Sequence, residues 1–151
     1  MGVTRDEGGG MRDEQPPGYA EANKGYALRI VKLYAALPKN AIAQVLGKQI
    51  LRSGTSVGAQ YREACRAKSN ADFINKIEGA LQELDETLYW LELIGESKVM
   101  NAARLESLSA ETEELIAMFV TIVKGVKEKA KMLKNKGVIP HPSALIPKEH
   151  G

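Results

Sequence analysis

The strongest constraint on the fold is an apolar stripe of helical spacing, which occurs in four successive stretches of the chain. In the third stretch apolar residues recur every three or four positions, so one face of a helix holds them all. These residues are Phe73, Ile77, Ala80, Leu81, Leu84, Leu88, Leu91 and Ile94. Aromatic residues, which are typical of strands, make up only 5% of the chain. We therefore predict an all-α fold.

Capping and helix-breaking residues set the expected bounds of the helices. Pro38 cannot continue a helix, Asn40 and Ser69 are suitable N-caps, and Gly137 is a stop signal. The stripes and these signals predict helices over residues 20–37, 40–68, 69–96 and 105–135, with a short turn at 97–101. We expect the helical domain to span residues 19–136, between a disordered leader at 1–18 and an irregular, proline-containing tail at 137–151.

Short loops between long helices favour an antiparallel up-down-up-down four-helix bundle. Helices of this length are rods of about 40 to 50 Å, and their large surface favours oligomers. The second helix contains Gly54 and Gly58, which together cost about 2 kcal/mol relative to alanine in a helix interior. A close crossing with another helix is the favoured explanation, and a break into two helices is the alternative.

The chain contains patterns that would indicate catalysis or metal binding elsewhere, but here they lack the structural context that such sites require. Residues 54–58 (GTSVG) match a hydrolase nucleophile elbow, but that motif requires a strand-to-helix turn and this one lies within a helical pattern. His141 and His150 both lie in the tail, so no predicted helix carries the Glu-x-x-His pair of a bundle di-metal site. An enzyme that uses Ser56 or the core acids is the weakest hypothesis. The sequence predicts a non-enzymatic protein without metal or cofactor.

Cysteine usage and hydropathy point to the cytoplasm. The single Cys65 excludes an intramolecular disulfide and is compatible with a reducing compartment. No apolar run approaches the ~20 residues of a membrane helix, and the N-terminus lacks the apolar segment of a secretory signal. We expect a cytoplasmic protein with no membrane partner.

The net charge of +2 hides a strong segregation of charge along the chain. The segment sums are −3 for residues 1–23, +8 for 24–68, −5 for 69–98, −3 for 99–123 and +5 for 124–151. In an up-down bundle one end should gather Arg62, Arg66, Lys68, Lys76, Lys124, Lys127, Lys129, Lys131, Lys134 and Lys136, joined by Lys24. The opposite end should carry Glu92, Glu96, Glu106, Glu111, Glu113 and Glu114. We predict one basic and one acidic end.

The basic end suggests a partner with a phosphate backbone. Six lysines against one glutamate between residues 124 and 136 exceed what helix capping requires. Our first hypothesis is that this end contacts RNA or DNA backbone with little sequence readout, because stacking aromatics are absent from it. The alternative is a structural or protein-interaction module in which the lysines serve solubility.

Residues 49–64 (QILRSGTSVGAQYREA), followed by Asp72-Phe73 and by residues 80–91 (ALQELDETLYWL), resemble the 23S rRNA intervening-sequence proteins. The resemblance covers about residues 20–135, and Gln60 departs from the asparagine that is common there. It implies a small bacterial four-helix bundle without enzymatic activity, assembled as a ring-like homopentamer.

The resemblance also bears on partners and on individual residues. Some family members are encoded within insertions in 23S rRNA genes. A related branch, the accessory variability proteins of diversity-generating retroelements, is a basic pentamer that binds a reverse transcriptase and nucleic acid. The motif residues would have structural roles that hold the second helix against the third or against a neighbour; they are Arg52, Ser56, Arg62, Glu63, Glu83, Glu86 and Trp90.

Overall fold

The computed structural model describes residues 18–137, which form four long helices and one short 3-10 helix. Their bounds are α2 Tyr19–Ala36, α3 Ala41–Cys65, α4 Asn70–Glu96, η2 Ala102–Leu105 and α5 Glu106–Asn135. No strand occurs within residues 18–137, so the prediction of an all-α fold is confirmed. The predictions for the leader before residue 18 and for the tail beyond residue 137 lie outside the described residues.

The predicted N-caps form, whereas one helix end and one short helix differ from the sequence prediction. Asn40 Oδ1 accepts a hydrogen bond from the Ala43 amide (2.9 Å), and Ser69 Oγ accepts one from the Asp72 amide (3.0 Å). The second helix was expected to reach Lys68, but α3 ends at Cys65 because the next two amide groups turn back onto carbonyls of the last helical turn. The 3-10 helix η2 was not predicted.

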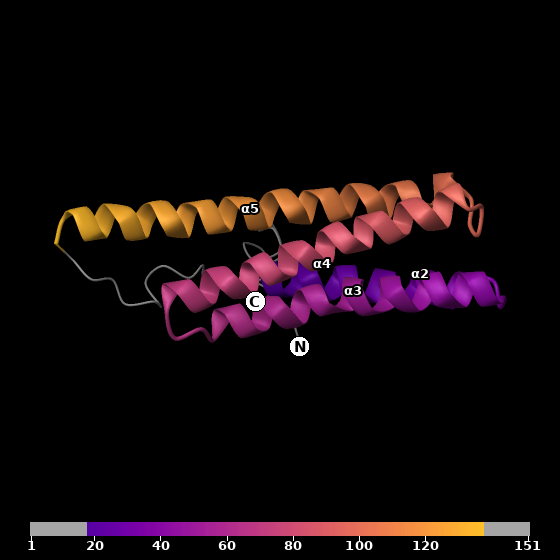
Figure 1. Ribbon diagram of the computed structural model, residues 1–151, viewed down its shortest axis with the longest axis horizontal. Helices are drawn as coiled ribbons and strands as arrows, with labels where there is room; N and C mark the ends of the chain where they lie inside the picture. The colour runs from indigo at the N-terminus through magenta and orange to yellow at the C-terminus, as the bar shows by residue number, and fades with distance from the viewer. Residues whose placement is uncertain (1–17, 138–151) are drawn as a thin grey trace, which may run out of the picture.

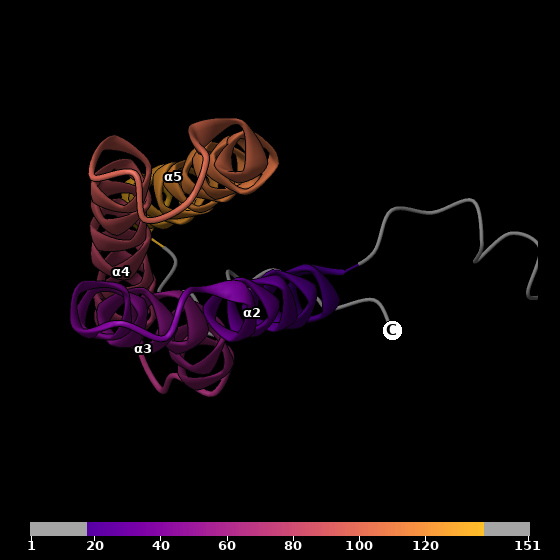
Figure 2. The same cartoon turned by 90° about the vertical axis from the view of Figure 1, so that its right-hand side faces the viewer.

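The four long helices lie alongside one another, and α3 and α4 each pack against two other long helices (Figures 1 and 2). Helix α3 packs against both α2 and α4, and α5 packs against α4. Along the α3–α4 contact, Ser53 bonds Thr87 (2.7 Å) and Lys76 bonds Glu63 (2.9 Å), so residue numbers rise along one helix as they fall along the other. The C-terminal turns of α5 extend past the ends of the other three helices (Figure 1).

Aromatic rings and paired hydroxyl groups fill the core. Tyr26, Tyr61, Phe73 and Phe119 are all fully or almost fully buried, and Tyr61 stacks on Phe119 with ring centroids 5.8 Å apart. The buried hydroxyl of Tyr26 shares a 2.7 Å hydrogen bond with Thr112 of α5. This bond joins α2 to α5, two helices that otherwise have few close contacts.

Glycines in α3 allow the close approach of α2. A Cβ atom at Gly54 would lie 2.7 Å from Ile30 Cγ1, and one at Gly47 would lie 2.7 Å from Leu37 Cδ1, both too short for a real contact. Because α3 is continuous from Ala41 to Cys65, the close-crossing explanation is confirmed and the break into two helices is wrong.

The crossing predicts opposite effects for two glycine-to-alanine changes. Gly54→Ala should destabilise the protein by about 1 to 3 kcal/mol, because the new methyl group displaces the fully buried Ile30. Gly125→Ala on α5, where nothing lies within 4 Å of the added Cβ, should stabilise it by about 0.5 to 1 kcal/mol through helix propensity. Urea unfolding followed by circular dichroism measures both changes, and equal effects would contradict the close crossing.

The core hydroxyl of Tyr26 should make stability fall at alkaline pH. Burial raises the pKa of Tyr26 from 10.0 to about 12. Between pH 10 and 12 the unfolded chain therefore loses this proton while the folded chain keeps it, which favours unfolding by about 2 to 3 kcal/mol at the upper limit. Tyr26→Phe should remove this part of the pH dependence. Thr112 still donates to the Leu108 carbonyl (2.8 Å), so the variant should fold, and parallel pH profiles for the two proteins would disprove the assignment.

Candidate nucleic-acid interface

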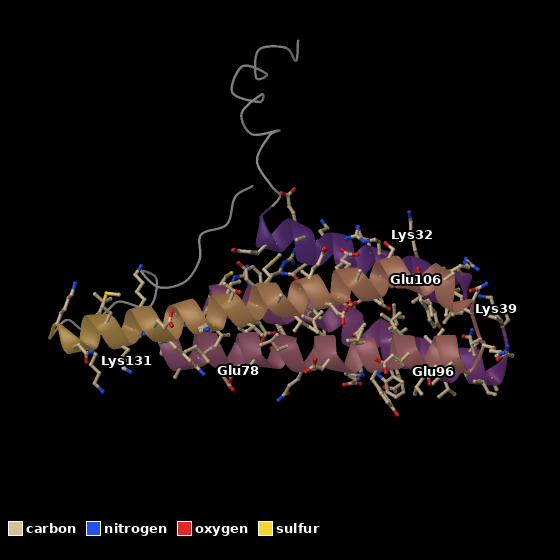
Figure 3. The ribbon with its side chains drawn as sticks, turned by 90° about the horizontal axis from the view of Figure 1, so that it is seen from above. Lys32, Lys39, Glu78, Glu96, Glu106 and Lys131 are labelled. Atoms are coloured by element: carbon tan, nitrogen blue, oxygen red, sulfur yellow. The ribbon has the colours of Figure 1, made fainter. Side chains whose placement is uncertain are left out.

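The end of the molecule where α3 ends, α4 begins and α5 projects carries the predicted basic residues. We call this surface the lysine-rich end. All of its members are exposed; they are Arg62, Arg66, Lys68, Lys124, Lys127, Lys129, Lys131, Lys134 and Lys136. Lys131 lies on the projecting part of α5, well away from the acidic residues labelled at the opposite end (Figure 3).

Most of the positive charge at the lysine-rich end is not neutralised by the described residues. Lys127 Nζ lies 3.6 Å from Glu78 Oε2 of α4. Lys76, which was expected to join the basic group, instead donates to Glu63 at 2.9 Å, and this contact raises the pKa of Lys76. Within residues 18–137, no carboxylate forms an ion pair with Lys124, Lys131, Lys134 or Lys136.

Aromatic rings do lie near this end, but they are part of the core. Tyr61 is 1% exposed, and Phe119 is completely buried beneath it. Tyr19, which is half-buried, meets the edge of the Tyr61 ring at a centroid distance of 6.0 Å. The rings of this cluster therefore stabilise the bundle and do not offer a free face for base stacking.

The opposite end is mixed, so the prediction of an acidic end is wrong. Lys32 and Lys39 lie at the same end as Glu96 and Glu106 (Figure 3). Arg29 of α2 forms an ion pair with Glu111 of α5, and that carboxylate raises the pKa of Arg29. Glu96 ends α4 and Glu106 begins α5, whereas Lys32 lies on α2, Lys39 lies in the α2–α3 turn and Lys98 lies in the turn after α4.

The motif residues in α3 and α4 bind one another. Arg52 forms ion pairs with Glu83 (3.3 Å) and with Glu86, and the Trp90 indole donates to Glu86 Oε2 at 3.1 Å. The Ser56 hydroxyl donates to the backbone carbonyl of Arg52 at 2.7 Å, so its proton is already engaged within the helix. These contacts join the two central helices along their half-exposed flank.

Comparison with known proteins identifies the family. The family model of the 23S rRNA-intervening sequence protein matches residues 20–121. The chain belongs to this family. It is also similar to a crystal structure of a protein of unknown function, assigned to the S23 ribosomal protein family of Bacteroides thetaiotaomicron. The two are 43% identical with a TM-score of 0.66, over 70% of this chain and 97% of that one. No curated protein matches the chain.

Neither a metal-binding cluster nor a membrane-spanning helix is found in the described part of this family member. Among residues 18–137, no group of three or more histidine, cysteine or carboxylate side chains is arranged to hold a metal ion. No helix in that part of the chain is long and apolar enough to cross a membrane.

Two features of the structure were not predicted from the sequence, because both depend on the positions of the helices along their axes. One is the projection of α5 beyond the bundle, which separates Lys131 from neutralising carboxylates. The other is the buried hydrogen bond between Tyr26 and Thr112, which lie 86 residues apart in sequence. Apolar periodicity gives the face of a helix, but it does not give its axial position, so neither feature has a signal in the sequence.

The Arg52–Glu86 contact should contribute little stability. Arg52 is 50% exposed, and ion pairs open to solvent typically contribute 1 kcal/mol or less. A double-mutant cycle with Arg52→Ala and Glu86→Ala should give a coupling energy of about 0.5 to 1 kcal/mol at low salt and less at high salt. Urea unfolding followed by Trp90 fluorescence measures it. A coupling energy above about 2 kcal/mol would show that this contact is a main determinant of register.

Proposed function

We propose that this protein is a non-catalytic, oligomeric four-helix bundle that binds RNA or DNA backbone through its lysine-rich end. The observation that carries the proposal is the projection of α5 with Lys131, Lys134 and Lys136 exposed and not paired with any described carboxylate. When such lysines neutralise phosphates, the cations condensed on the nucleic acid are released into solution. This release favours binding, and it favours binding most at low salt.

The surface favours backbone contacts over base recognition. Lysine is a flexible point charge that contacts phosphate without the fixed geometry needed to read a base edge. The neighbouring Tyr61 and Phe119 rings are buried, which leaves base stacking without a platform there. The family name makes RNA the first ligand to test.

Assembly would increase the local potential. We propose that antiparallel up-down-up-down bundles associate as a ring-like homo-oligomer, as the resemblance implies for a pentamer, so that several lysine-rich ends lie close together. A reverse transcriptase of the diversity-generating retroelement type stays a prediction for a protein partner. The same holds for the cytoplasmic location.

A second candidate, a protein-interaction module without nucleic-acid binding, is favoured by apolar side chains on the flank of the central helices. Ile42 and Val45 of α3 are 64% and 62% exposed, and Tyr89 of α4 is 54% exposed. A contiguous exposed apolar patch is typical of a surface that another chain covers, and these side chains would contribute to such a patch.

The two candidate functions predict different effects on RNA binding when the projecting lysines are neutralised. The triple variant Lys131→Gln, Lys134→Gln and Lys136→Gln should weaken binding to labelled single-stranded RNA. It should also reduce the slope of log affinity against log salt by about 2, because three phosphate contacts are lost. Fluorescence anisotropy between about 50 and 200 mM salt measures both quantities.

A matched variant removes the same charge elsewhere. Lys32→Gln, Lys39→Gln and Lys48→Gln also lower the net charge by three, but Lys32 and Lys39 lie at the opposite end (Figure 3). This control should keep most of the affinity and the full salt slope. If the control and the triple variant behave alike, or if wild-type protein binds no nucleic acid at about 50 mM salt, nucleic-acid binding through the lysine-rich end is ruled out.

A further inference from the structure

An apolar hollow of about 370 Å³ lies between α4, η2 and α5, at the end opposite the lysine-rich end. It is lined by Leu91, Glu92, Gly95, Glu96, Ala102, Leu105, Glu106, Ser109, Ala110 and Glu113. We call it the acid-rimmed hollow. Neither the proposed nucleic-acid binding nor the motif residues of α3 and α4 involve it.

The floor of the hollow is apolar, and a glycine lines it beside two leucines. Leu91 and Leu105 are 2% and 4% exposed and form the base. Gly95 carries no side chain, and a Cβ atom there would lie 3.4 Å from Leu105 Cδ1 and 3.5 Å from Ala102 Cβ. The volume is at the lower end of the range that binding sites for ligands occupy.

The rim of the hollow is anionic and unneutralised. Glu92, Glu96, Glu106 and Glu113 are all exposed, and none forms an ion pair within residues 18–137. Glu96 and Glu106 lie on the two helices that flank the hollow (Figure 3). A cation placed between the helices would relieve the repulsion among these carboxylates.

We propose that the acid-rimmed hollow is a docking site for a cationic amphipathic helix of a partner protein. Glu92 and Glu96 lie one helical turn apart on α4, and Glu106 and Glu113 lie about two turns apart on α5. Two rows of charge along an apolar groove match an elongated ligand with an apolar stripe between basic residues. A small cation would use only one pair of carboxylates and would leave the floor uncovered.

A synthetic peptide tests the proposal directly. The probe is a fluorescein-labelled peptide of about 14 leucines and lysines with helical amphipathic spacing, titrated with the full chain at about 50 and 300 mM salt. We expect Glu92→Gln, Glu96→Gln, Glu106→Gln and Glu113→Gln together to weaken binding at least about tenfold. The control carries Glu21→Gln, Asp85→Asn, Glu114→Gln and Glu128→Gln, which remove the same charge outside the hollow, and should bind within about twofold of wild type.

A second pair of variants tests the apolar floor without changing charge. Ala110→Leu fills the hollow and should also weaken binding about tenfold, whereas Ala117→Leu, on the exposed surface of α5 outside the hollow, should not. These exposed alanines tolerate leucine, so the pair remains informative if the quadruple variant fails to fold.

Three results would overturn the proposal. One is the absence of peptide binding at low salt, and another is equal weakening by the hollow and control variants. The third is salt-reversible self-association of the peptide-free chain that the four hollow substitutions abolish, because the occupant would then be a second copy. These results are separate from the test of nucleic-acid binding, since every variant keeps all the lysines and arginines of the lysine-rich end.

Discussion

The close crossing of α2 over α3 is the constraint on which the rest of the arrangement depends. Gly47 and Gly54 remove the side chains that would keep the two helices apart, so Leu37 and Ile30 reach the backbone of α3. A neighbouring face of α3 meets α4 through the buried Ser53–Thr87 pair. Helix α5 completes the core by placing Phe119 against Tyr61. The small residues therefore lower helix propensity locally but allow dense packing of the core.

The positions of the helices along their axes determine which charged side chains lack an ion-pair partner. Carboxylates of α4 and α5 pair with cations where helices overlap, as in Lys127–Glu78 and Arg29–Glu111. Where α5 projects beyond the bundle, Lys131, Lys134 and Lys136 form no ion pair with the described residues. At the opposite end, the four carboxylates around the hollow also form no ion pair with the described residues. The molecule thus presents two chemically distinct surfaces far apart, and each favours a different class of partner.

Sequence predicted the helices better than their relative placement. The apolar stripes and the caps Asn40 and Ser69 predicted the four long helices to within about three residues at each end, because these signals are local. The acidic end was wrong because the sum of +8 over residues 24–68 combines cations of both ends; Lys32 and Lys39 lie beside the acids. Arg52 and Glu86 were predicted only as motif residues with structural roles, and their pairing appears in the structure; the acid-rimmed hollow likewise depends on a tertiary contact, that of Gly95 with η2.

The sparse connection between α2 and α5 has a consequence for the motions of the folded state. Helix α2 begins at Gly18 without a side-chain cap and meets α5 mainly through Tyr26–Thr112 and Arg29–Glu111. Amide hydrogens of the first turn of α2 should therefore exchange with solvent faster than those around Tyr26, where the crossing with α3 and the bond to Thr112 keep the helix in the core.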